Sequence, residues 1–200
     1  MTIKEICDLV TAKLRSTSDD RILPDRLVLQ ELDNTRLMLI PEMHREFPDA
    51  IDSCVASISG LSLAKESTTT PTLNTRHTLI VDNIADLPEG LGIVYMCTSY
   101  GEQVYRTRVT DRYIGSKAPW GKKCAMYEKI GPVIYVTGIN NTSKAKIEIT
   151  YIPASHYGFN EQSRYLFPDN MIETLVDAVF SKLIRLLSIP QDIENDSKDV

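Results

Sequence analysis

The chain has 200 residues, of which 42% are hydrophobic, and its formal net charge is −5. This length suffices for one domain with an appendage, and the negative balance argues against a dedicated nucleic-acid-binding protein without excluding a local basic face. No apolar run approaches the roughly 18 residues that a membrane-spanning helix needs, so we expect no membrane partner.

The N-terminal residues predict helices. Thr2 and Glu5 have the spacing of a capping box, and apolar residues then recur at helical spacing, which predicts a helix over 3–15. This opening stretch is too charged for a signal peptide, so we expect synthesis in a cytoplasm. A second helix should begin near Pro24 and end at Pro41. Residues 61–72 are typical of an exposed connector, and we assign 1–66 to the helical part.

From residue 73 onward, apolar residues recur at the spacing of β-strands rather than at the spacing of helices. β-like runs occupy 77–81, 93–98, 103–110, 124–130, 133–137 and 146–152. Residues 146–152 alternate polar and apolar side chains, which is typical of a half-buried antiparallel strand. We therefore predict an antiparallel β-rich insertion over 73–152.

The chain closes with a strongly apolar helical pattern. Pro168 and Asp169 open it, Pro190 ends it, and its apolar stripe is wide enough for a buried helix. Residues 153–188 should therefore complete a helical bundle with the N-terminal helices. Segregated helices and strands of this kind predict an α+β fold.

Catalytic chemistry is not indicated by any motif in the sequence. Phosphate-binding, dinucleotide-binding, zinc-protease and serine-hydrolase signatures do not occur. The four cysteines are far apart and should be buried free thiols, and the three histidines are equally scattered, so we predict no metal and no cofactor. His156 is interpreted as a surface or packing residue rather than a catalytic base. We expect a protein that is not an enzyme.

A basic and aromatic stretch runs from Tyr105 to Lys129. Its seven Lys and Arg residues outnumber Asp111 and Glu128, which gives a net charge of +5. Such a stretch could be a solvated loop, a face that binds another subunit, or a surface that follows a phosphate backbone and stacks on bases. The residues of this candidate face are Arg106, Arg108, Arg112, Lys117, Trp120, Lys122 and Lys123.

The last twelve residues, 189–200, form an acidic tail. Its final ten residues have a net charge of −3, and its apolar side chains have nothing local to pack on. The tail could be a frayed terminus, or a docking peptide that orders on a partner. The candidate docking residues are Ile189, Pro190, Asp192, Ile193, Glu194, Asp196, Asp199 and Val200.

The layout and some of its local patterns resemble a known family. The residues that do so are 18–25 (SDDRILPD), 167–172 (FPDNMI) and 189–196 (IPQDIEND). They resemble the head-to-tail connector, or neck adaptor and ring, proteins of short-tailed bacteriophages, including the crAss-like group.

This resemblance implies a structural virion protein of the phage neck and tail. Its partners would be itself, in a ring of twelve subunits, the portal protein, neighbouring ring proteins, and genomic DNA that passes through the lumen without sequence recognition. Two alternatives remain open at this point. One is a tail-completion or stopper subunit, and the other is a nucleic-acid-binding module that uses residues 105–129.

Overall fold

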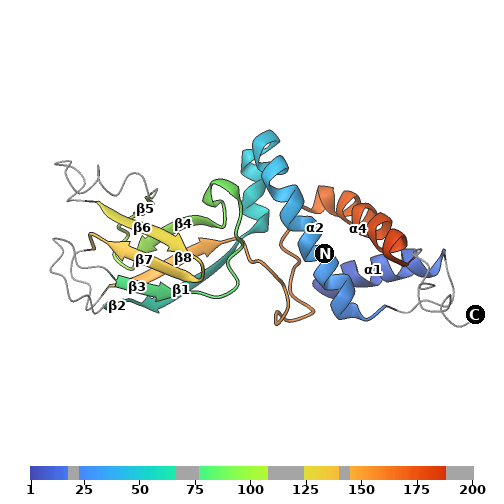
Figure 1. The fold of residues 1–200 in the computed structure, drawn as a ribbon, viewed down its shortest axis with the longest axis horizontal. Helices are drawn as coiled ribbons and strands as arrows, with labels where there is room; N and C mark the ends of the chain where they lie inside the picture. The colour runs from blue at the N-terminus through green and yellow to red at the C-terminus, as the bar shows by residue number, and fades with distance from the viewer. Residues whose placement is uncertain (18–22, 66–76, 108–123, 140–144, 188–200) are drawn as a thin grey trace, which may run out of the picture. The chain divides into compact units, whose positions relative to one another are not determined.

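The computed structural model describes residues 1–17, 23–65, 77–107, 124–139 and 145–187. The chain divides into two compact units (Figure 1). The helical unit comprises residues 1–54 and 155–200, and the β-rich unit comprises residues 55–154. The β-rich unit is therefore inserted between two parts of the helical unit, and the α+β class is confirmed.

In the described part of the helical unit, three α-helices contact one another and form the core. They are α1 (Ile3–Arg15), α2 (Asp25–Glu46) and α4 (Ile172–Leu187), with short 3₁₀ helices η1 (Pro48–Cys54) and η4 (Asp169–Met171). The predicted capping box is present, since Thr2 and Glu5 satisfy each other's backbone N–H groups. The fully buried apolar side chains of these three helices include Ile6, Val10, Val28, Leu32, Ile40, Leu175 and Val179.

The second helix is longer than the sequence predicted. Pro41 was expected to end it, but α2 continues through Pro41 to Glu46. Proline removes one helical hydrogen bond. Here the flanking Ile40 and Met43 side chains are both buried, and their packing favours continuation of the helix. Ion pairs also join the helices, from Lys13 to Asp177 and from Lys182 to Glu31.

Among the described residues of the β-rich unit, eight strands in two sheets enclose the core. One sheet has the order β1 (Ala56–Ser62), β8 (Lys146–Tyr151), β4 (Ile93–Thr98). The other has the order β2 (Ala64–Lys65), β3 (His77–Ile80), β7 (Val133–Thr137), β6 (Ala125–Ile130), β5 (Val104–Arg106). Both sheets contribute inward side chains to one hydrophobic cluster, which includes Leu79, Met96, Ile134, Val136, Ile147 and Ile149.

Two features of the strands differ from the sequence prediction. The predicted helical part, 1–66, contains β1 and β2, because a bulge between Ile58 and Leu61, with Gly60 at a φ of 76°, interrupts the alternation of side chains. The insertion is also not purely antiparallel, since β5 pairs with β6 in parallel. A parallel pair needs a long connection between its strands, and in the sequence β5 ends at Arg106 while β6 begins only at Ala125.

Candidate functional site

Most of the predicted site residues lie outside the described residues. This is true of the whole acidic tail, 189–200, and of Arg108, Arg112, Lys117, Trp120, Lys122 and Lys123. Arg106 is the one member of the predicted basic face that the described part of the chain includes. The roles of these residues therefore remain predictions.

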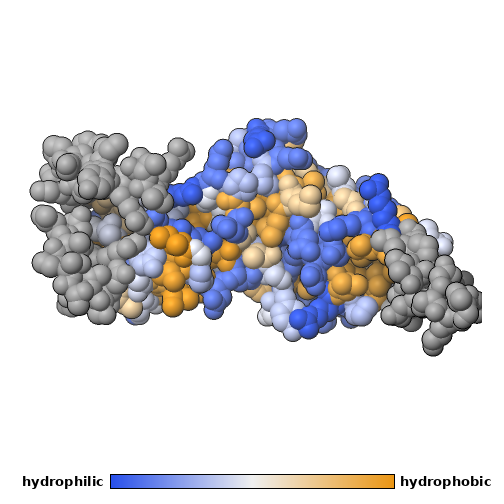
Figure 2. Space-filling view, viewed as in Figure 1, coloured by the Kyte–Doolittle hydropathy of each residue, from blue (hydrophilic) through white to orange (hydrophobic). Residues whose placement is uncertain are grey.

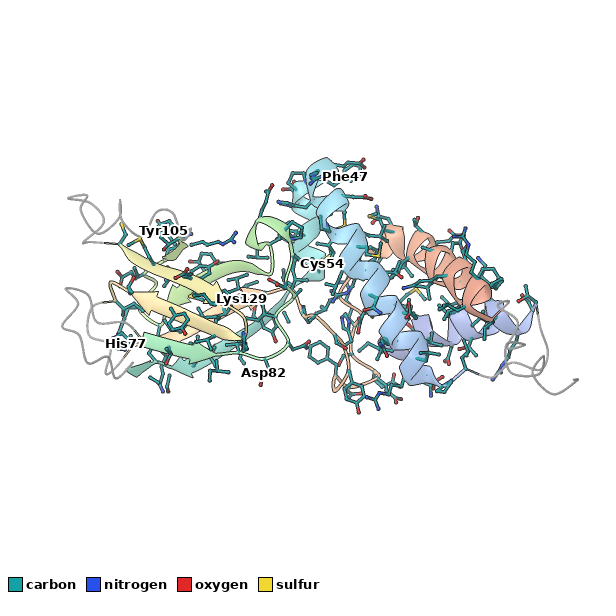
Figure 3. All side chains as sticks on the ribbon, in the orientation of Figure 1. Phe47, Cys54, His77, Asp82, Tyr105 and Lys129 are labelled. Atoms are coloured by element: carbon teal, nitrogen blue, oxygen red, sulfur yellow. The ribbon has the colours of Figure 1, made fainter. Side chains whose placement is uncertain are left out.

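Arg106 ends strand β5 and packs against a turn of its own unit. Its guanidinium lies against Gly90, where an added Cβ would come within 1.9 Å of the Arg106 Cζ atom. Both residues line a small cavity of about 80 Å³, together with Tyr127 and Lys129. Lys129 forms an ion pair with the exposed carboxylate of Asp86, with 3.6 Å between Nζ and Oδ1 (Figure 3). The described basic residues of this stretch, Arg106 and Lys129, thus contact residues of their own unit.

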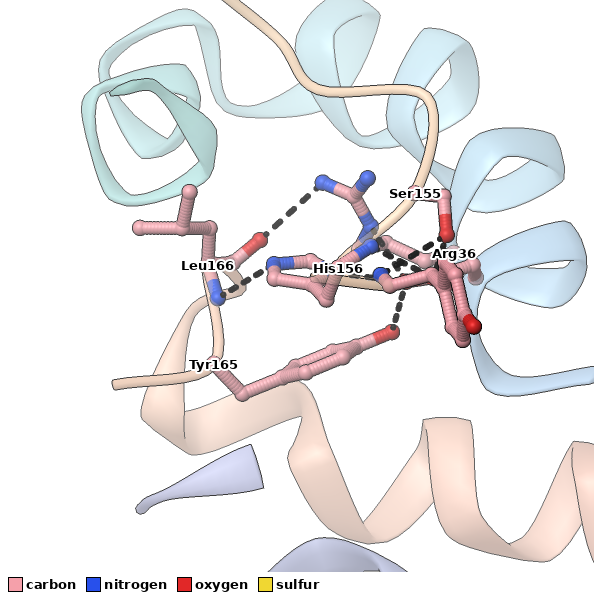
Figure 4. A network of polar contacts seen from close by, with 7 residues as sticks. Arg36, Ser155, His156, Tyr165 and Leu166 are labelled. Carbon is pink, nitrogen blue, oxygen red and sulfur yellow. Dashed lines mark hydrogen bonds and ion pairs between the residues drawn. The ribbon is translucent and has the colours of Figure 1, made fainter. Parts of the chain in front are cut away.

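The helical unit contains a buried polar network that the sequence did not reveal (Figure 4). Its centre is Asp33 on α2, whose carboxylate accepts hydrogen bonds from the Ser155 hydroxyl at 3.0 Å and from the His156 backbone N–H at 2.8 Å. The same carboxylate is 2.6 Å from His156 Nδ1 and 3.3 Å from the Tyr165 hydroxyl. These bonds attach the segment from Ser155 to Tyr165 to the middle of α2.

The hydrogen bonds of His156 define its tautomer. The side chain is 1% exposed, and its Nε2 accepts a hydrogen bond from the Leu166 backbone N–H at 3.2 Å. Nε2 therefore has no proton, and Nδ1 donates its proton to Asp33. Burial is the main reason that the pKa of His156 is lowered, and the Arg36 charge adds to it. The ring is neutral in the folded chain.

Arg36 and Tyr165 complete the network. The Arg36 side chain is fully buried, its Nε lies 3.8 Å from Asp33, and it donates a hydrogen bond to the Leu166 carbonyl. Burial disfavours the charge of Asp33, but hydrogen bonds from His156 and the charge of Arg36 outweigh it, so the pKa of Asp33 is lowered. The Tyr165 ring stacks on His156 at 4.3 Å between centroids.

This arrangement is suited to holding structure rather than to catalysis. Both ring nitrogens of His156 are occupied, and neither it nor Asp33 is open to a substrate. Sequence reasoning left open whether His156 was a surface or a packing residue, and it missed the partner, Asp33. One feature of the sequence could have indicated this network. Asp33 and Arg36 lie on the same side of the predicted helix as the apolar residues Leu32 and Ile40, which is unusual for two charged residues.

Other types of site receive no support from the described residues. No group of three or more His, Cys, Asp or Glu side chains there could hold a metal ion. None of the helices described has the length and apolar character that crossing a bilayer requires. Cys7, Cys54 and Cys97 are buried free thiols, as predicted, and Cys124 is half-buried. Burial raises the pKa of Cys7 to about 12 and that of Cys54 to about 11.

The five-stranded sheet presents an apolar surface on the side opposite its core. Register places Ile80, Val133 and Ile130 side by side on β3, β7 and β6. Further along, Tyr105 and Met126 are neighbours on β5 and β6. Figure 2 shows hydrophobic residues gathered over the strands of this unit. The register also places Thr78 and the buried Glu128 on this side. We call this surface the outer sheet face and define it by Thr78, Ile80, Tyr105, Met126, Glu128, Ile130, Val133 and Tyr135.

Comparison with models of known protein families identifies the family of this chain. The model of the family "phage tail ring protein 2", from crAss-like phages, matches residues 5–199. The chain belongs to this family. No curated protein sequence matched it. The ring protein is thus a structural ring component of the virion tail, and the family assignment agrees with the prediction of a protein that is not an enzyme.

Proposed function

We propose that this ring protein forms a closed ring of twelve copies in the phage neck, where it joins the capsid portal to the tail. The match to the tail ring family over residues 5–199 carries this proposal. Genomic DNA would pass through the lumen without sequence recognition. A net charge of −5 is compatible with that passage, because a lumen poor in Lys and Arg makes few phosphate contacts that would retain DNA.

We further propose that residues 189–200 dock the ring onto the portal or onto a neighbouring subunit. The support is a complementarity in the sequence, since the last ten residues have a net charge of −3 and the stretch 106–129 has a net charge of +5. Opposite charges would speed the encounter. The apolar residues Ile189, Ile193 and Val200 would then be buried and would set the lifetime of the contact.

Deletion of residues 189–200 tests the docking role. The truncated chain should keep the melting temperature of the free subunit, because the described core of the helical unit does not need the deleted residues, and it should fail to assemble with portal rings. A chain in which Asp192, Glu194 and Asp196 become Asn keeps the apolar anchors and should assemble more slowly. A chain extended by a neutral Gly-Ser segment after Val200 is the control. Normal assembly by the truncated chain would contradict docking by the tail.

A further inference from the structure

Two cations line the small cavity at the carboxyl ends of β5 and β6. We call it the Arg106 cavity and define it by Asp86, Gly90, Arg106, Tyr127 and Lys129, which lie around its volume of about 80 Å³. Register pairs Arg106 of β5 with Tyr127 of β6, and Lys129 follows two residues later on β6. Paired residues, and residues two apart on one strand, share one face of a sheet. Arg106 and Lys129 therefore lie on the same face as the buried Tyr127.

The described residues neutralise these two cations only in part. Lys129 pairs with Asp86 at 3.6 Å, and the Asp86 side chain is fully exposed. An ion pair with an exposed partner contributes little to stability, so Asp86 can give way to another carboxylate. In the part of the chain that the structure describes, no ion pair of Arg106 is found. The lining holds no other charged side chain, so two cations and one carboxylate give the cavity a net charge of +1.

The guanidinium of Arg106 is held at the cavity by the turn on which it lies. A Cβ added at Gly90 would overlap the guanidinium, so a residue without a side chain is needed there. Burial raises the pKa of the Tyr127 hydroxyl, and the charge of Arg106 opposes this rise, so its positive charge acts within the cavity. A guanidinium that is already positioned presents a planar fork of donors to a carboxylate.

The size of the cavity favours a single carboxylate over a metabolite or a nucleic acid. Pockets for small molecules measure about 300–1,000 Å³, so about 80 Å³ admits only the end of one side chain. A phosphate of duplex DNA is flanked by two sugars on a convex backbone, and it would not enter so small a recess. A carboxylate side chain, by contrast, ends in a free planar group that a guanidinium binds through two parallel hydrogen bonds.

The acidic tail, residues 189–200, is the segment of this chain that supplies such groups. It contains Asp192, Glu194, Asp196 and Asp199, and its last ten residues have a net charge of −3. That charge is complementary to the net +1 of the Arg106 cavity. In a ring of identical copies, each subunit would carry one tail and one cavity, and such different surfaces can meet between successive subunits.

We propose that the Arg106 cavity binds a carboxylate side chain from the acidic tail of a neighbouring copy. Arg106 donates two hydrogen bonds to that carboxylate, and Lys129 exchanges the exposed Asp86 for it. This inference rests on the proposed function, in which residues 189–200 dock a subunit of the ring. It adds the described residues that receive the tail.

The test is fluorescence anisotropy of a labelled synthetic peptide of residues 189–200, titrated with the full chain at low salt. The wild-type chain should bind the peptide, and added salt should weaken the binding. Arg106→Gln and Lys129→Gln should each weaken it about fivefold or more, because each removes a charged donor from a partly exposed site. Arg106→Lys keeps the charge without the fork and should bind between the wild type and R106Q. Arg45→Gln is the matched control, since Arg45 is an exposed arginine on α2, in the other unit.

The outcomes separate this proposal from the proposed function. Weaker binding by R106Q and K129Q, with normal melting temperatures and normal binding by R45Q, supports the Arg106 cavity. Binding by R106Q equal to that of the wild type overturns it. A wild type that does not bind the peptide at the highest concentration reached also overturns it, as does equal binding of a peptide in which Asp192, Glu194 and Asp196 are Asn. If deletion of the tail abolishes assembly with portal rings while R106Q assembles normally, the proposed function stands without this site.

Discussion

Replacement of Asp33 by Ala should strongly destabilise the helical unit. The carboxylate accepts hydrogen bonds from Ser155, from the backbone and ring of His156, and from Tyr165, and it lies beside the fully buried Arg36. Its removal leaves several buried donors without an acceptor and a buried cation without its counter-charge. Breaking a buried charge pair from one side costs about 3–5 kcal/mol. We expect a loss of about 4 kcal/mol in the free energy of unfolding, within this range.

The assay is urea denaturation of the full chain, followed by far-UV circular dichroism at the helical band. Because such a loss is a large part of the about 5–15 kcal/mol that folds a domain, milder variants are needed as well. Tyr165→Phe removes only the 3.3 Å hydrogen bond and should cost about 1 kcal/mol. Asp33→Asn should fall between the two. Glu42→Ala, at an exposed position on the same helix, should stay within about 0.5 kcal/mol.

The expected order of destabilisation is therefore Asp33→Ala, Asp33→Asn, Tyr165→Phe and Glu42→Ala, from largest to smallest. An Asp33→Ala chain as stable as the Glu42→Ala control would refute the reasoning, because it would mean that the network contributes nothing to holding the segment 155–166 on α2.

Three further predictions concern pH, backbone conformation and DNA. His156 has a lowered pKa and binds its proton more readily in the unfolded chain, so stability should fall as pH drops below about 6.5. Stability should fall again below about pH 4, because Asp33 binds a proton more readily in the unfolded chain than in the folded chain. For His156, a urea midpoint that stays constant from pH 7 to pH 5 would contradict a neutral buried imidazole. Gly90 and Gly101 both have a positive φ, and Ala at Gly101 should cost about 1 kcal/mol of stability. Gly90→Ala should cost more, because only Gly90 lies against Arg106. In thermal melts, adding Arg106→Ala to Gly90→Ala should remove this additional loss of stability. Binding to random duplex DNA should be undetectable at physiological salt by fluorescence anisotropy, and tight binding that weakens steeply with salt would favour the nucleic-acid alternative.

The features that the sequence predicted well are those set by local periodicity. The capping box at Thr2 and Glu5 and the alternation in 146–152 depend on side chains a few residues apart, and both elements formed where expected. Pro41 misled the prediction because the cost of one missing hydrogen bond is local, whereas the burial of Ile40 and Met43 that offsets it depends on tertiary packing.

Contacts between distant residues could not be predicted in the same way. Asp33 and His156 are 123 residues apart, and nothing in either neighbourhood specifies the other. The outer sheet face is likewise a property of register, since Ile80 and Ile130 become members of one row only once β7 lies between them. Single-sequence patterns indicate which faces are apolar, but the pairing of strands decides which apolar residues meet.

The central claim is that this chain forms a ring in the phage neck, and the most direct test is a cryo-EM reconstruction of the portal vertex of the parent virion, with symmetry tested rather than imposed. We predict a closed ring of this chain around the DNA channel, adjacent to the portal, with residues 189–200 ordered on an adjacent protein. A particle whose neck and tail lack the chain, or contain it only outside a closed ring, would contradict the account.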